Sequence, residues 1–132
     1  MKWNFLIFHQ KKKDRWINFR ICEENLQRLN LRMGQVSVRL TDASHLFVSG
    51  MIQRSNVSNI FIVPAVNIVC QIENADGNIL MSVRDNHTQN IELNPSAPFF
   101  LAIYSISRFL FPDDIDHVVL SCDRSDETRT GQ

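Results

Sequence analysis

The stretch Arg15–Leu40, RWINFRICEENLQRLNLRMGQVSVRL, changes its hydrophobic period twice and decides what kind of fold the chain can form. At its start, Ile17, Phe19 and Ile21 alternate with polar residues, a period of two that predicts a half-buried strand. Residues 35–40 alternate in the same way and predict a second strand. The stretch therefore predicts a chain built mainly from strands.

Between these two strands, residues 23–31 predict a short helix. Its first turn carries two glutamates and its end carries arginines, which is the order that the helix dipole favours. Leu26 and Leu29 lie on the side of this helix that faces away from the charged residues, so we expect them in the core. Asn30 or Gly34 can adopt the left-handed conformation that ends a helix.

Further strands are expected on both sides of this stretch. Asp76 and Gly77 form a strong hairpin signal between two β-prone runs, 66–72 and 79–84. The sequence TDAS at 41–44 predicts a turn before another strand. The remaining expected strands cover residues 3–9, 45–52, 59–63 and 115–122.

The segment 99–111 is apolar on nearly every side when it is drawn as a helix. Ser96 suits an N-cap and Pro98 suits the first turn of such a helix, which Pro112 would end. A helix with no clear polar stripe is expected to be buried. The ordinary explanation is a central core helix, and the alternative is a dimer or partner interface made by Phe99, Phe100, Ile103 and Phe109.

These elements predict an α+β fold, mostly antiparallel β in a barrel or sandwich. It carries one short N-terminal helix and one buried apolar C-terminal helix. A chain of 132 residues is long enough for a real core, and we expect one compact domain over residues 1–122. Residues 123–132 have no apolar side chain and are expected to form a flexible tail.

The charge is zero overall but divided between the two halves of the chain. Residues 1–54 contain ten basic and four acidic side chains, a net charge of +6. Residues 55–132 contain four basic and ten acidic side chains, a net charge of −6. A basic half of this kind can bind phosphate by releasing counterions. Equally, the two halves can neutralise one another within one molecule or across a dimer.

The order strand, turn, strand, short helix, strand, turn, strand resembles the swapped-hairpin DNA-binding fold of AbrB and MazE-type proteins. The residues that carry the resemblance are Leu29, Asn30 and Leu31, similar to the family's helix ending, and 33–38, similar to the start of its next strand. The resemblance covers about residues 5–53. Three positions depart from the family pattern, which has Pro, Gly and Asp in place of Cys22, Asn30 and Gln35.

That resemblance implies an intertwined homodimer that regulates transcription and lays a basic N-terminal face on DNA. Lysine and arginine suit such a face, because phosphate contacts fix the register and arginine can also reach guanine edges. The DNA-binding positions that it implies are Lys11, Lys12, Lys13, Arg15 and Arg20. The alternatives are that the lysines form a solvated turn, and that the protein is an interaction module. An inhibitor, immunity protein or chaperone of this type would hold a protein partner with the acidic half and the apolar helix.

Signals for chemistry are weak, and we expect a non-enzymatic protein without a cofactor or metal. The sequence contains no phosphate-binding glycine loop. A cluster of carboxylates and an imidazole could supply oxygen and nitrogen ligands to a divalent metal, although turn residues commonly look the same. Its members are Asp113, Asp114, Asp116 and His117.

The cysteines and the apolar runs bear on where the protein works. Cys22, Cys70 and Cys122 are widely spaced and odd in number, so neither a disulfide framework nor a metal knuckle is suggested. No stretch reaches about 18 uninterrupted apolar residues, the length of a spanning helix, and the first residues do not fit a signal peptide. We therefore expect a cytoplasmic protein that does not bind a membrane.

Overall fold

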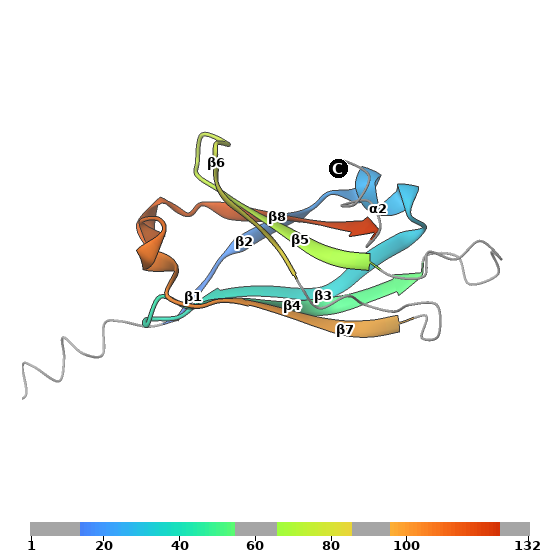
Figure 1. The fold of residues 1–132 in the computed structure, drawn as a ribbon, viewed down its shortest axis with the longest axis horizontal. Helices are drawn as coiled ribbons and strands as arrows, with labels where there is room; N and C mark the ends of the chain where they lie inside the picture. The colour runs from blue at the N-terminus through green and yellow to red at the C-terminus, as the bar shows by residue number, and fades with distance from the viewer. Residues whose placement is uncertain (1–13, 55–65, 86–95, 125–132) are drawn as a thin grey trace, which may run out of the picture.

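The computed structural model describes residues 14–54, 66–85 and 96–124. Figure 1 shows them as two stacked layers of strands. The strands are β1 (Arg15–Trp16), β2 (Asn18–Ile21), β3 (Leu31–Leu40), β4 (Leu46–Arg54), β5 (Val66–Glu73), β6 (Ile79–Arg84), β7 (Ser96–Ile103) and β8 (His117–Arg124). The helices are α2 (Glu23–Arg28) and two 3-10 turns, η1 (Ile106–Arg108) and η2 (Pro112–Asp114).

The two layers are two four-stranded sheets. Sheet A has the strand order β1-β3-β4-β7, and sheet B has the order β2-β8-β5-β6. Among these strands, every pairing is antiparallel except that of β2 with β8, which is parallel. Figure 1 shows α2 at one end of the sandwich and the 3-10 turns at the other. The expected mostly antiparallel β architecture is confirmed in the sandwich form.

The single strand predicted from Arg15 onward is divided between the sheets. β1 pairs with β3 in sheet A, and β2 pairs with β8 in sheet B. Ile17 lies at the crossing point, where its side chain is buried and its N–H donates to the Val38 carbonyl at 2.9 Å. Alternation alone does not show such a switch, and it places Phe19 on the buried side of the strand although Phe19 is 41% exposed.

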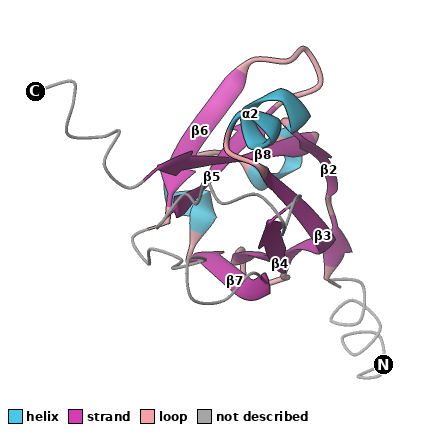
Figure 2. Ribbon diagram, turned by 90° about the vertical axis from the view of Figure 1, so that its right-hand side faces the viewer, coloured by secondary structure: helices cyan, strands magenta, loops and turns pink. Residues whose placement is uncertain are grey.

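The hydrophobic core is made of side chains from both sheets, and Figure 2 shows the two sheets facing one another. Leu26 and Leu29 are buried there, as predicted, so α2 is fixed to the end of the sandwich through its apolar side. Complete burial of one such side chain contributes about 1.5–3 kcal/mol. The largest fully buried side chains include Leu26, Leu31, Leu46, Ile52, Ile68, Ile72, Ile106 and Leu120.

The buried C-terminal helix predicted over 99–111 is wrong. The first half of that segment is β7, whose side chains alternate between the core and solvent. Phe99 is buried and Phe100 is exposed. Apolar side chains therefore lie on both faces of the strand, which is why the segment looked apolar on all sides as a helix. Pro98 is compatible with this strand because β7 is an edge strand of sheet A. On the outer side of an edge strand no neighbouring strand requires a backbone N–H donor.

The turns predicted at 41–44 and at Asp76–Gly77 are confirmed. Asn30 ends the short helix region with a φ of 60°, and α2 itself stops at Arg28. Gly77 has a φ of 85° in the hairpin between β5 and β6, a conformation that glycine adopts without strain. No helix within the described ranges is long and apolar enough to cross a bilayer.

Gly50 supplies a test of how β4 and β7 pack. It lies opposite Phe99 in the register, and a Cβ added to Gly50 would come 2.8 Å from Phe99 Cζ. Because that ring is buried, Gly50→Ala must displace it, and we expect unfolding in urea to show a loss of about 1–3 kcal/mol. Gly34→Ala is the matched control, since its new Cβ meets no atom within 4 Å. Equal losses in the two variants would contradict this packing.

Candidate functional site

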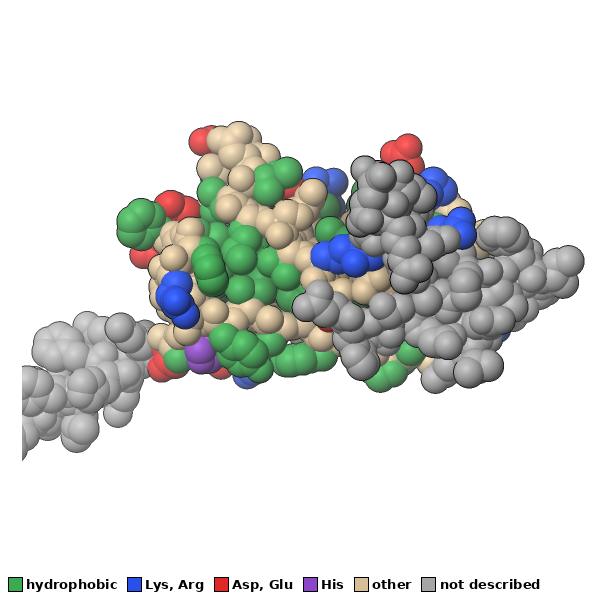
Figure 3. Space-filling model, viewed as in Figure 1, with side chains coloured by type: hydrophobic (Ala, Val, Ile, Leu, Met, Phe, Trp, Pro, Cys, Tyr) green, Lys and Arg blue, Asp and Glu red, His purple; other side chains and the backbone are tan. Residues whose placement is uncertain are grey.

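The outer face of sheet A exposes a contiguous group of aromatic side chains at the end nearest the 3-10 turns. In the register, Trp16 on β1 lies opposite Arg39 on β3, and Arg39 lies opposite Phe47 on β4. Figure 3 shows hydrophobic side chains beside a histidine at the lower left of the molecule, over the ends of β4 and β7. We call these aromatic side chains, together with the arginine between them, the aromatic face. Its members are Trp16, Arg39, His45, Phe47, Phe100 and Tyr104.

Phe47 is the centre of the aromatic face. Its ring stacks on Phe100 with the centroids 5.6 Å apart and the planes at 26°, and it meets Tyr104 edge-on at 5.9 Å. The Arg39 guanidinium lies 5.4 Å from the Phe47 centroid. Aromatic pairs and cation–π contacts of this geometry are favourable beyond their buried area, so the rings hold one another in place.

The backbone around the face fixes its position as well. His45 Nδ1 accepts a hydrogen bond of 3.0 Å from the Ser105 N–H, and its ring meets Tyr104 edge-on at 5.2 Å. The Ile106 N–H donates to the Ser44 carbonyl at 2.8 Å. The turn before β4 is therefore tied to the chain that follows β7, and Tyr104 is held beside Phe47.

Three of the rings are largely open to solvent. Trp16 is 69% exposed, Phe100 is 56% exposed and Tyr104 is 63% exposed. Water does not favour exposed aromatic surface, and contiguous exposed patches on soluble domains commonly mark interaction sites. The aromatic face is therefore the strongest candidate for a functional surface among the described residues.

The rest of the same sheet face mixes polar and apolar side chains, and Met51 lies opposite Pro98 there in the register. The Ser37 and Ser49 hydroxyls are hydrogen-bonded to each other at 3.0 Å. Arg32 Nε donates to Gln53 Oε1 at 3.0 Å, at the other end of the strands. Hydroxyl, amide and guanidinium groups thus continue the face away from the rings and offer donors and acceptors to a ligand.

Arg39 is the cation nearest the rings, and it is accessible. It forms an ion pair of 3.3 Å with Asp14, and both side chains are 42% exposed. An ion pair that is open to water contributes little to stability and can exchange for another anion. In the sequence, Lys11, Lys12 and Lys13 come directly before Asp14.

The residues predicted to contact DNA do not all lie on one surface. Lys11, Lys12 and Lys13 lie outside the described residues. Arg15 is exposed on β1 of sheet A and donates to the Pro112 carbonyl at 2.9 Å, whereas Arg20 is exposed on β2 of sheet B. The division of the predicted strand between the sheets separates these two arginines.

The residues predicted as an interface are also divided. Phe99 and Ile103 point into the core, and Phe100 and Phe109 are exposed. Only Phe100 among these four belongs to the aromatic face. Its position on the sheet follows from the alternation of β7, which a helical interpretation of the segment conceals.

The acidic cluster near the C-terminus forms contacts within the protein. His117 Nδ1 lies 2.8 Å from Asp116 Oδ2 and its Nε2 lies 3.0 Å from Glu73 Oε1, so both ring nitrogens face a carboxylate. Asp113 and Asp114 lie in η2. Within 14–54, 66–85 and 96–124, no three Asp, Glu, His or Cys side chains form a group that could hold a metal ion.

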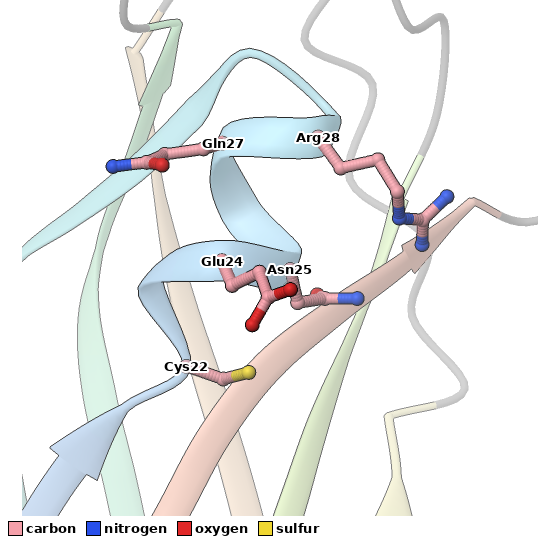
Figure 4. Close-up of a pocket in the computed structure, with 5 residues that line it drawn as sticks. All are labelled: Cys22, Glu24, Asn25, Gln27 and Arg28. Atoms are coloured by element: carbon pink, nitrogen blue, oxygen red, sulfur yellow. The ribbon is translucent and has the colours of Figure 1, made fainter.

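An open pocket lies beside α2, and its residues are shown in Figure 4. Gln27 and Arg28 extend to opposite sides of the helix there, so these two polar groups do not point to a common place. Asn25 is already used in the fold, because its Oδ1 accepts a hydrogen bond of 3.0 Å from the Cys122 N–H. The pocket does not compete with the aromatic face as a candidate site.

No family model, no curated protein and no solved structure matches this chain. The resemblance of residues 5–53 to AbrB and MazE-type proteins therefore stays a prediction.

Most of the aromatic face is not apparent from the sequence. Residues 46–52 do alternate, with Leu46, Val48 and Ile52 buried and Phe47 on the other side. That alternation can be recognised in the sequence, but it does not show that Trp16 and Tyr104 lie on the same sheet face. Their position depends on the order of the strands in sheet A.

Proposed function

We propose that this protein is a small non-enzymatic nucleic-acid-binding protein that binds through the aromatic face and the neighbouring basic residues. The observation that carries the proposal is the exposed cluster of rings around Arg39. Proteins that bind nucleic acid combine aromatic side chains, on which bases stack, with arginine and lysine for the phosphates. The expected homodimer, regulatory role and cytoplasmic location remain predictions.

The distribution of charge supports this proposal. Arg32 and Arg39 are cations on the outer face of sheet A, and Asp14 is the carboxylate that pairs with Arg39. The run Lys11–Lys13 adjoins Asp14 in the sequence. A basic run adds attraction for a polyanion that depends on salt but not on the nucleotide sequence.

A protein partner is the second candidate, and the same cluster favours it. Tryptophan, tyrosine, phenylalanine and arginine are enriched where protein interfaces gain most of their affinity. The two candidates differ in their dependence on salt. Binding to nucleic acid weakens steeply as salt rises, whereas an interface dominated by apolar rings depends on salt only slightly.

The first test is fluorescence anisotropy of labelled DNA titrated with the full chain at two salt concentrations. We expect binding that weakens with salt, and a triple variant Lys11→Glu, Lys12→Glu and Lys13→Glu that binds more weakly. Loss of three phosphate contacts should reduce the slope of log affinity against log salt by about 2 to 3.

The control for this test is the triple Lys→Arg variant, which keeps the charge and should retain the affinity. DNA binding that is absent at low salt would overturn the proposal. Unchanged affinity in the Lys→Glu variant would remove the lysines from the binding surface.

A further inference from the structure

We infer that the aromatic face takes a single strand of nucleic acid, whose unpaired bases stack on its exposed rings, and not a duplex. The inference rests on the proposed function and specifies its substrate. The rings that would receive bases are those of Trp16, Phe100 and Tyr104, each more than half exposed.

The shape of the surface argues against a duplex. The major groove admits a helix or a two-stranded ribbon, but the aromatic face lies on a sheet of four strands. The described α-helix has six residues and covers one end of the sandwich, away from the η1 and η2 end where the aromatic face lies (Figure 1). In a duplex the flat surfaces of the bases are covered by their neighbours, so exposed rings would gain no stacking partner.

The arrangement of the rings suits successive bases. Phe47 and Phe100 already stack on each other, which fixes the orientation of Phe100 before any ligand arrives. Trp16 lies on the other side of Arg39 in the register, so a cation stands between two places where a base can stack. A single strand alternates bases and phosphates. The spatial order of ring, guanidinium and ring therefore offers a stacking surface, a phosphate contact and a second stacking surface in turn.

The polar part of the face supplies further contacts. The Ser37 and Ser49 hydroxyls lie on β3 and β4, and Ser49 pairs with Phe100 in the register. Hydroxyl groups donate and accept, so they can bind base edges or sugars of different sequence. Arg39 has more N–H donors than its ion pair with Asp14 requires, and a phosphate can share them.

The experiment compares a labelled oligothymidylate of about 12 nucleotides, a usual length for one such surface, with a duplex of equal length. Both are titrated with the full chain at low and at raised salt. We expect the single strand to bind at least about tenfold more tightly, and the double variant Trp16→Ala, Phe100→Ala to lose at least about tenfold in single-strand affinity.

Two further variants keep the result interpretable. Phe111→Ala removes an exposed ring outside the aromatic face and should leave affinity unchanged. Trp16→Phe, Phe100→Tyr keeps the stacking surfaces and should restore most of the binding. Circular dichroism of each variant shows whether it is folded.

The outcomes distinguish the substrate from the function. A duplex that binds as tightly as the single strand would overturn the inference and leave the proposed function standing. A double alanine variant that binds normally would overturn both, because both place the bound nucleic acid on the aromatic face. Absence of binding to either probe at low salt would overturn both the inference and the proposed function. A protein would then be the remaining candidate partner for the aromatic face.

Discussion

Phe99→Ala is expected to lower the free energy of unfolding by about 3–5 kcal/mol, the usual loss when a buried phenylalanine is truncated. The Phe99 ring points into the core from β7 and packs over Gly50 of β4. Its removal leaves a cavity between these strands that the surrounding backbone cannot close, because β4 is paired on both sides. Urea denaturation followed by circular dichroism measures the loss.

Phe100→Ala is the matched control, since it removes the same side chain one position further along. Phe100 is exposed and stacks on Phe47, so we expect a loss of no more than about 1 kcal/mol. In a helix buried on all sides, both substitutions would be severe. Similar large losses in both variants would therefore contradict the strand assignment of Ser96–Ile103.

The cysteines are expected to differ in reactivity by about a thousandfold. Burial raises the pKa of the Cys70 thiol from 9.0 to about 12, and burial together with the neighbouring Asp123 raises the pKa of Cys122 further. Because the thiolate is the reactive form, an upward shift of about three in pKa removes about 99.9% of it near pH 8. Cys22 is only half-buried, so in native protein one thiol should react rapidly with a disulfide reagent.

The same shifts set a limit on alkaline stability. Below pH 9 the thiols are protonated in both states, so their burial has no pH dependence there. Above pH 9 the unfolded chain releases these protons first, so stability should fall until pH passes the raised pKa of the folded state.

The control for the thiol experiment is Cys22→Ser, which should abolish the rapid phase and leave two slow thiols. All three should react rapidly in denaturant. Rapid reaction of three thiols in the native protein would contradict the burial of β5 and β8.

The local parts of the fold could be predicted from the sequence, because they depend on neighbouring residues. The period of two predicted residues 35–40, the second half of β3, and β-prone runs beside turns predicted β4, β5 and β6. The hairpin signal at Asp76 and Gly77 located the turn between the last two. Leu26 and Leu29 were assigned to the core from their position on the expected helix over residues 23–31, and both are buried. These features rest on dihedral preferences and on which side of an element is apolar.

The failures concern features that depend on distant residues. The 99–111 segment is apolar throughout, so periodicity could not separate a buried helix from a strand with one exposed aromatic face. The crossing at Ile17 needs β3 and β8 to be in place on opposite sides of it. The aromatic face forms only when neighbouring strands bring Trp16, Phe47 and Tyr104 onto one surface. No local sequence pattern predicts the order of the strands in sheet A.

The most direct measurement is a chemical-shift map of the isotope-labelled chain titrated with oligothymidylate. We predict that the perturbed amides cluster on β1, β3, β4 and β7 around Phe47, with Trp16 and Tyr104 among the most affected. Perturbations that cluster instead on the outer face of β2, β8 and β5, or around α2, would contradict binding at the aromatic face.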